Sequence, residues 1–344
     1  MIETDLNSLW FLLIAVLWIG YFFLEGFDFG VGILLPFVGR DDLDRRVAIH
    51  TIGPLWDGNE VWLLVAGGAT FAAFPEWYAT LFSGFYLPLF LILVALILRG
   101  VAFEYRAKDR RPQWQAWWDR AIFFGSALPA LLWGVAFANI VHGVALDASF
   151  EYTGGLGNLL HPYALLGGLT TLLLFTLHGA TFLGLKAAGP VAERAHRYGS
   201  MLALPTVVVA GGFLAWTLVD ASGGNRGTFA LGVLIAVAAV AAMAALAAAA
   251  LLRAKRDGWA FAATGVTIFT AVLMLFLDLY PRVMPSSTAE ANSLDIYNAA
   301  STPTTLRVMT VVALIFVPVV LAYQAWSYWV FRKRVTREQL SPTG

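Results

Sequence analysis

The sequence predicts an all-α polytopic membrane protein with about nine transmembrane helices in a single domain spanning residues 1–344. Three observations support this fold class. Hydrophobic residues make up 59% of the chain and charged residues only 13%, which lies far outside the usage of soluble proteins. Apolar stretches of about 20 residues, the length that crosses a bilayer, recur along the chain. Lysine and arginine gather in the short segments between these stretches.

Nine segments are predicted to span the membrane. In chain order they cover approximately residues 8–36, 54–74, 77–104, 119–144, 160–185, 199–219, 228–252, 257–280 and 304–331. The first follows an acidic amino terminus, where a secretory signal needs lysine or arginine, so we expect it to be retained. The second is the least apolar, because its first turns contain Asp57, Asn59 and Glu60. The alanine-rich stretch 236–250 favours a peripheral or lipid-facing helix.

Positive charge is distributed unevenly between the two sides of the predicted helices. Alternate loops and the tail are rich in it, with Arg40, Arg45 and Arg46, then Arg106, Lys108, Arg110 and Arg111, then Lys186, Arg194 and Arg197, then Arg253, Lys255 and Arg256, and finally Arg332, Lys333, Arg334 and Arg337. The intervening side has only Arg226, Arg282 and Arg307. Because cytoplasmic loops carry the excess of lysine and arginine, we expect the amino terminus outside and the carboxyl terminus in the cytoplasm.

Composition excludes several kinds of chemistry. The chain has no cysteine, which removes disulfides, thiolate nucleophiles, iron–sulfur clusters and covalent haem attachment. Its formal net charge is zero, so it has no basic field to hold nucleic acid. A bis-histidine haem needs two ligands at matching depth on neighbouring helices. His142 and His161 share the outer side, His178 lies in an inner half, and His50 and His196 lie in inner loops. We therefore expect no haem or metal ligand in this chain.

Carboxylates inside apolar segments are the unusual feature of the sequence. Glu25 and Asp28 belong to the motif EGFDFGVG, and Asp57 and Glu60 belong to GPLWDGNEVW. A charge near the middle of a bilayer costs about 2.5–3.5 kcal/mol, so these four groups need partners, water or a function. The first helix runs inward and the second runs outward. We therefore expect all four acids at similar depth near the cytoplasmic end.

Helical spacing places the two acids of each motif on one face of its helix. Gly26 and Gly30 form a GxxxG pattern beside the first pair, which would let another helix approach closely. In the simpler interpretation the acids are satisfied locally by backbone amides, tryptophan indoles such as that of Trp56, Asn59 or Arg99. In the functional interpretation they transfer protons or ions, as ionisable residues inside membranes commonly do.

Arg99 and Glu104 lie near the cytoplasmic end of the third predicted helix. Paired with Asp28 or Asp57, Arg99 would keep a carboxylate ionised. Alternatively, its long side chain extends to the membrane interface. Glu104 is either a member of the acidic group or a solvated loop residue, and the residues leave both interpretations open.

Two functions follow from these residues alone. Buried acids could relay protons to redox chemistry elsewhere in a complex, or they could line the substrate site of a proton-coupled transporter, with the cluster of Glu25, Asp28, Asp57 and Glu60 as its centre. Transporters often have interrupted helices at the midplane and repeated halves. Here the acids gather on one side and no repeat is evident, which favours the relay. A scaffold role for a partner is compatible with it.

Long, ordered blocks of the sequence resemble a known family. EGFDFGVG, GPLWDGNEVWL, AGGATFAAFPEWYATLFSGFY, LRGVAFEYR, VMPSST and NAASTPTTLRVMT are similar to subunit II of the cytochrome bd quinol oxidases. The resemblance implies two four-helix bundles plus a peripheral helix in a bacterial inner (cytoplasmic) membrane. It also implies a heterodimer with subunit I, which binds haems b558, b595 and d, whereas subunit II usually binds none.

The resemblance further implies that the complex oxidises quinol at the outer face and reduces dioxygen to water with cytoplasmic protons. The family's proposed proton path between subunits corresponds here to Asp57 and Glu104, and relatives have aspartate at the latter position. For Glu25 and Asp28, a structural and a proton-relaying role both stay open. Some members bind a structural quinone or a small accessory subunit, and the residues decide neither. The candidate site therefore comprises the acids and their supporting residues, namely Asp57, Glu104, Asp28, Glu25, Glu60, Trp56, Asn59 and Arg99.

Overall fold

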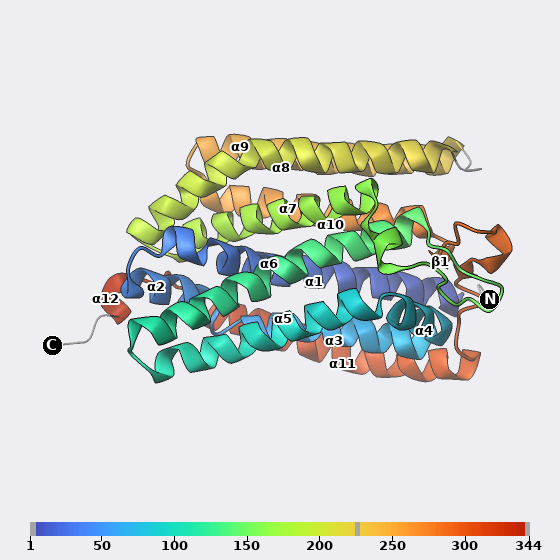
Figure 1. Ribbon diagram of the computed structural model, residues 1–344, viewed down its shortest axis with the longest axis horizontal. Coiled ribbons are helices and arrows are strands. Elements are labelled where there is room, and N and C mark those ends of the chain that lie inside the picture. The colour runs from blue at the N-terminus through green and yellow to red at the C-terminus, as the bar shows by residue number, and fades with distance from the viewer. Residues whose placement is uncertain (1–4, 224–227, 341–344) are drawn as a thin grey trace.

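The computed structural model of the chain describes residues 5–223 and 228–340. Long helices lie nearly side by side, and the connections between them gather at the two ends of the molecule (Figure 1). We call one end the basic end. It contains the short helices α2, Asp42–Ile52, and α12, Arg337–Leu340. The opposite end contains the two long connections, residues 143–161 and 280–302.

The helices form two groups and one outlier. The first helix group comprises α1 Leu6–Val38, α3 Trp56–Ala73, α5 Tyr86–Tyr105 and α6 Pro112–His142. The second helix group comprises α7 Pro162–Lys186, α8 Pro190–Gly223, α9 Thr228–Arg253 and α10 Asp257–Leu279. Helices α1 and α6 pack against α7 and so join the groups. The outlier, α11 Pro303–Val330, lies along α1 and α3 at the edge (Figure 1).

The remaining elements are short. They are the helix α4 Pro75–Gly84, the 3₁₀ turns Arg106–Lys108, Leu156–Leu160 and Glu290–Asn292, and the antiparallel strands β1 Arg282–Met284 and β2 Leu294–Asp295. At the opposite end the two long connections are hydrogen-bonded to each other. The amides of Ser287 and Asn292 donate to the carbonyls of Val144 and Leu146, respectively, both at 2.9 Å. These hydrogen bonds hold the two connections together at that end.

The predicted spans agree with most of the observed helices. Eight helices of the described chain are long and apolar enough to cross a membrane. The segment 54–74 forms α3, a helix of 18 residues that is not among these eight because Asp57, Asn59 and Glu60 make its first turns polar. The predicted helix 77–104 is wrong as one piece. Pro75 starts the separate helix α4, and α5 begins only after Phe85.

Three helices or helix starts at the basic end differ from the prediction. Residues 42–52 form α2 rather than a loop, because Asp41 caps the helix by accepting a hydrogen bond from the amide of Asp44. Helices α6 and α8 start several residues before the predicted positions, each with proline in its first turn, where proline is favoured. As a result His50 and His196, expected in loops, lie in α2 and α8.

The close approach predicted from the GxxxG pattern is confirmed. A methyl group on Gly30 would overlap the carbonyl oxygen of Phe175, and one on Gly179 would overlap the backbone of Gly30. Gly26 lies against the ring of Phe175. Backbones of α1 and α7 therefore touch at the centre of the molecule, which fixes the helix that carries Glu25 and Asp28.

Candidate functional site

Arg99 on α5 is the centre of a buried polar group inside the first helix group. Its guanidinium forms an ion pair with the carboxylate of Glu25 on α1, and neither side chain is exposed. A second carboxylate, Oε2 of Glu60 on α3, lies 3.2 Å from Nη2 of Arg99. The ring of Phe29 covers one side of the guanidinium at 4.7 Å. This arrangement joins α1, α3 and α5 through one cation.

The sequence places Arg99 inward by helical spacing. It shares the buried face of α5 with Ala95 and Ala102. Helix α6 comes close at this level, since a methyl group on Gly125 would lie 2.8 Å from Cβ of Arg99. Arg99 therefore does not extend to the interface. Its charged partners are Glu25 and Glu60, not the expected Asp28 or Asp57.

Asp28 is fully buried and is held by a neutral group. Its Oδ2 accepts a hydrogen bond of 2.7 Å from the side-chain amide of Asn59 on α3. The amide oxygen of Asn59 in turn accepts from the Tyr328 hydroxyl at 2.7 Å and from Nε2 of Gln324 at 3.4 Å. Both of these residues come from α11. We call Glu25, Asp28, Glu60, Asn59 and Arg99 the acid cluster.

Tyr328 and Gln324 are absent from the sequence-based candidates. Their spacing of four residues puts both on one face of the last long helix, and Gln324 is the one amide in an otherwise apolar segment. That pattern was available in the sequence. It does not indicate which helix the pair faces, because Asn59 lies 269 positions before Tyr328.

The surface acids lie apart from this buried group. Asp57 and Glu104 are both exposed, whereas Glu60, three residues after Asp57, has a side chain that is 23% exposed and contacts Arg99. The structure thus brings together three of the four motif acids and leaves Asp57 outside. Trp56, half buried beside it, packs on the ring of Phe103 with 5.2 Å between ring centroids.

An apolar cleft of about 460 Å³ opens between α3, α4 and α5. Exposed rows on these helices flank it and lead toward the surface acids. On α3 the row of Leu64 and Val61 ends at Asp57, and on α5 the row of Ile97 and Val101 ends at Glu104. The floor of the cleft is formed by aromatic side chains that include Trp18, Trp77, Trp133 and Phe137. Together these rows form a wide apolar face, which carries two carboxylates near the basic end of the molecule.

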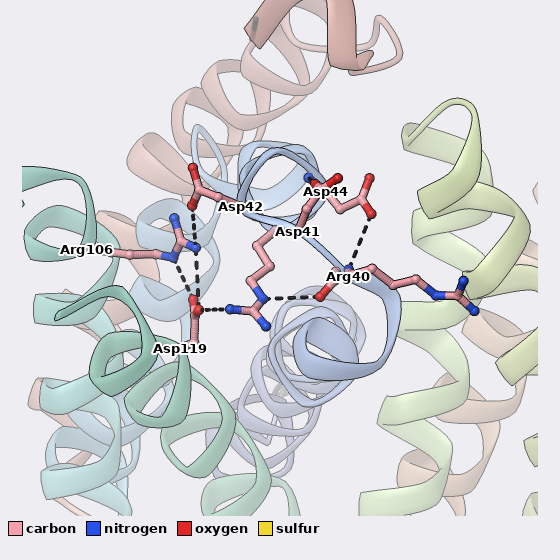
Figure 2. Close-up of polar contacts among 8 residues, drawn as sticks. Arg40, Asp41, Asp42, Asp44, Arg106 and Asp119 are labelled. Atoms are coloured by element: carbon pink, nitrogen blue, oxygen red, sulfur yellow. Dashed lines mark hydrogen bonds and ion pairs between the residues drawn. The ribbon is translucent and has the colours of Figure 1, made fainter. Parts of the chain in front are cut away.

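A second ionic group fixes α2 at the basic end. Arg106, at the end of α5, lies between two carboxylates, donating from Nε to Asp119 at 2.6 Å and from Nη2 to Asp42 at 2.9 Å (Figure 2). Arg45 of α2 also donates to Asp119, at 2.9 Å. Asp119 belongs to the first turns of α6. These pairs connect α2 to α5 and α6.

Asp44 and Asp41 connect α2 to the carboxyl-terminal segment. The carboxylate of Asp44, 1% exposed, accepts from Arg194 at 2.5 Å and from Arg337 at 2.6 Å. Arg337 also donates to Asp41 at 2.8 Å. The backbone amide of Asp44 donates to Asp41, and this bond together with the Arg337 guanidinium lowers the pKa of Asp41 below its ordinary value.

The histidines have protein contacts of their own. Both ring nitrogens of the buried His178 are engaged, Nδ1 with Thr264 at 2.7 Å and Nε2 with the carbonyl of Phe23 at 3.2 Å. The rings of His142 and His161 are 4.7 Å apart between centroids, which leaves no room for a porphyrin between them. Over the described ranges, no three histidine, aspartate or glutamate side chains are grouped so as to hold a metal ion.

Comparison with known proteins finds likeness over nearly the whole chain. Residues 6–331 match the family model described as cytochrome bd terminal oxidase subunit II. The chain is 43% identical over 336 residues to cytochrome bd ubiquinol oxidase subunit 2 of Bacillus subtilis (strain 168), covering 98% of both chains. It is 37% identical to cytochrome bd-I ubiquinol oxidase subunit 2 of Escherichia coli (strain K12), covering 97% of this chain and 96% of the relative.

A solved structure has the same fold. A chain of the bd oxidase from Geobacillus thermodenitrificans superposes with a TM-score of 0.76, and the match covers 95% of this chain and 99% of that one. The sequence identity is 18%, so this likeness shows the fold alone.

Proposed function

This chain belongs to the cytochrome bd terminal oxidase subunit II family, and from that membership we propose that it delivers cytoplasmic protons to haem chemistry in a partner subunit. It is a multi-pass membrane protein, and its relatives are named as subunits of a quinol oxidase. The proposed reaction of the complex is oxidation of quinol and reduction of dioxygen to water. The proposed location of the protein is a bacterial inner membrane, with the basic end of the chain on the cytoplasmic side.

The observation that carries this proposal is a series of carboxylates of decreasing exposure. Asp57 is exposed, Glu60 one turn further along α3 is 23% exposed, and Glu25 beyond Arg99 is fully buried. One oxygen of Glu25 and one of Asp28 have no hydrogen-bond partner among the described residues. Successive acceptors of this kind can pass a proton inward, while Arg99 limits the cost of several carboxylates in one apolar interior.

Coverage by a partner subunit would explain the position of the surface acids. Asp57 and Glu104 lie at the end of the apolar face formed by α3 and α5. Facing lipid, each carboxylate would be costly, whereas a partner on this face would remove both from lipid. We propose subunit I, with haems b558, b595 and d, as that partner. This chain also supports its assembly.

The proposal assigns no redox cofactor to this chain, in keeping with the engaged nitrogens of His178. A structural quinone tail or a lipid chain would fit the lining of the cleft between α3 and α5. A small accessory subunit would add to the complex without changing the acid cluster. Family membership speaks against the transporter alternative, in which the same acids would surround a transported substrate.

The proposed function is tested by a reduced-minus-oxidised absorption spectrum. The chain, tagged and purified in mild detergent from its own membranes, is examined together with the proteins that co-purify. We expect a chlorin-type haem d signal that follows a larger partner and is lost when this chain is isolated alone. A colourless, solitary protein from cells that make the oxidase would overturn the proposal.

A further inference from the structure

We propose that Tyr328 and Gln324 of α11 are positioning residues, which hold the Asn59 amide on Asp28 and so place proton transfer through the acid cluster under the control of the outermost helix. The inference deepens the proposed function and rests on it. It concerns residues of α11 rather than the surface acids Asp57 and Glu104.

Hydrogen-bond direction fixes each side-chain amide in this chain of contacts. The indole of Trp62 can only donate, and it donates to Oε1 of Gln324 at 2.8 Å. Gln324 must therefore present its Nε2 to Asn59, whose Oδ1 lies 3.4 Å away. Tyr328 donates to the same oxygen at 2.7 Å. Asn59 is then left with its amide nitrogen toward Asp28, at 2.7 Å.

The alternative orientation of Asn59 would remove this support. A rotated amide would turn its oxygen toward the Asp28 carboxylate, and two acceptors would face each other in a buried site. The charged groups around Asp28 are Glu25 on its own helix, Glu60 on α3 and Arg99 on α5. None of them donates to Asp28 in the structure: Arg99 contacts Glu25 and Glu60 through Nη2, and its Nε and Nη1 have no hydrogen-bond partner among the described residues. Tyr328 and Gln324 thus determine whether Asp28 retains a donor.

Helix α11 needs an anchor to perform this role, because Leu306 is its one buried residue in the described chain. The anchor is the segment that follows Tyr328. Lys186 at the end of α7 donates to the carbonyls of Phe331 and Lys333, and its own carbonyl accepts from the amide of Val335 at 2.8 Å. Tyr328 lies one turn before this junction. The second helix group therefore sets the position of the hydroxyl that orients Asn59.

The test uses the complete oxidase complex with Tyr328→Phe, which removes one hydroxyl. Tyr323→Phe is the matched control, since Tyr323 is 67% exposed on the neighbouring turn of α11. We expect Tyr328→Phe to lower quinol-dependent turnover about threefold to tenfold, the scale of one hydrogen bond, with unchanged KM and haem content. Trp62→Phe, which removes the donor that orients Gln324, should lower turnover in the same way. The control should match the unsubstituted complex.

A spectroscopic readout separates positioning from general structure. Difference infrared spectra report the carboxyl and carboxylate stretches. A band that is lost in Asp28→Asn belongs to Asp28, and Tyr328→Phe should change this band. In an Asp28→Asn background, Tyr328→Phe should have no further effect on turnover. An active complex in which Tyr328→Phe equals Tyr323→Phe in turnover and spectrum would overturn this inference alone. Loss of haem in Tyr328→Phe would also overturn it by assigning a structural role. An unsubstituted complex without oxidase activity would overturn the proposed function and this inference together.

Discussion

Arg99 on α5 and Glu25 on α1 form an ion pair in which both side chains are fully buried. Burial of two ions costs several kcal/mol each, and their mutual attraction offsets this cost only while both are present. Glu60 approaches the same guanidinium from α3. The stability of the first helix group therefore depends on a charge balance, in addition to apolar packing.

Arg99→Ala should destabilise the protein by about 3–5 kcal/mol, because it leaves buried carboxylates without their cation. Thermal unfolding in detergent measures the change. Arg120→Ala is the control, since Arg120 is exposed on α6 and lies over the ring of Trp117. The double variant Glu25→Gln/Arg99→Ala should recover part of the loss. Equal unfolding temperatures for Arg99→Ala and Arg120→Ala would contradict the claim that the buried Arg99–Glu25 ion pair stabilises the protein.

Gly30→Ala should destabilise the contact between α1 and α7, because the added methyl group would overlap the carbonyl oxygen of Phe175. The matched control is Gly211→Ala within α8, where the methyl group would meet nothing within 4 Å. Alanine has the higher helix propensity by about 1 kcal/mol, so the control should be neutral or stabilising. If both variants unfold at the same temperature, the backbones of α1 and α7 are not in contact.

Hydropathy and charge predicted most spans of this fold, because apolar length and loop arginines are properties of single segments. The break at Phe85 was missed because residues 77–98 include no charged side chain, so hydropathy does not reveal the short helix α4. Helix α2 was missed because it is too polar and short for a span, although Asp41 provides a capping signal.

The candidate site was predicted less completely than the spans. Asp57 and Glu60 are three residues apart and so lie about 60° apart around the helix. Across the edge of a buried face, that angle is enough to put Glu60 against Arg99 and leave Asp57 exposed. Periodicity gives the face of a residue but not the helix opposite it. The partners of Arg99 and the role of Tyr328 therefore needed the three-dimensional arrangement.

Docking of the carboxyl-terminal segment should depend on pH through Asp41. Its pKa is lowered in the folded protein by the Asp44 amide and by Arg337, so the stabilisation is present above the ordinary value of 3.8 and is lost as the pH falls through the lowered pKa. This chain has no cysteine, so Glu338→Cys accepts one spin label on α12. The label should become mobile in that acid range.

The control for this experiment is Asp41→Asn, which removes the titrating group. The label in Asp41→Asn should be more mobile at neutral pH and should change less on acidification. A label whose mobility is independent of pH in the unsubstituted chain would show that Asp41 does not hold Arg337.

The central claim is that surface acids of this chain supply protons to chemistry in its partner. The most direct test is quinol-dependent oxygen consumption by the purified complex carrying Asp57→Asn, measured together with haem content. Glu193→Gln, an exposed acid in the first turn of α8 at the same end of the molecule, is the control. We predict that Asp57→Asn lowers turnover and leaves haem content unchanged, and that Glu193→Gln changes neither. Turnover equal to that of the control would contradict the account.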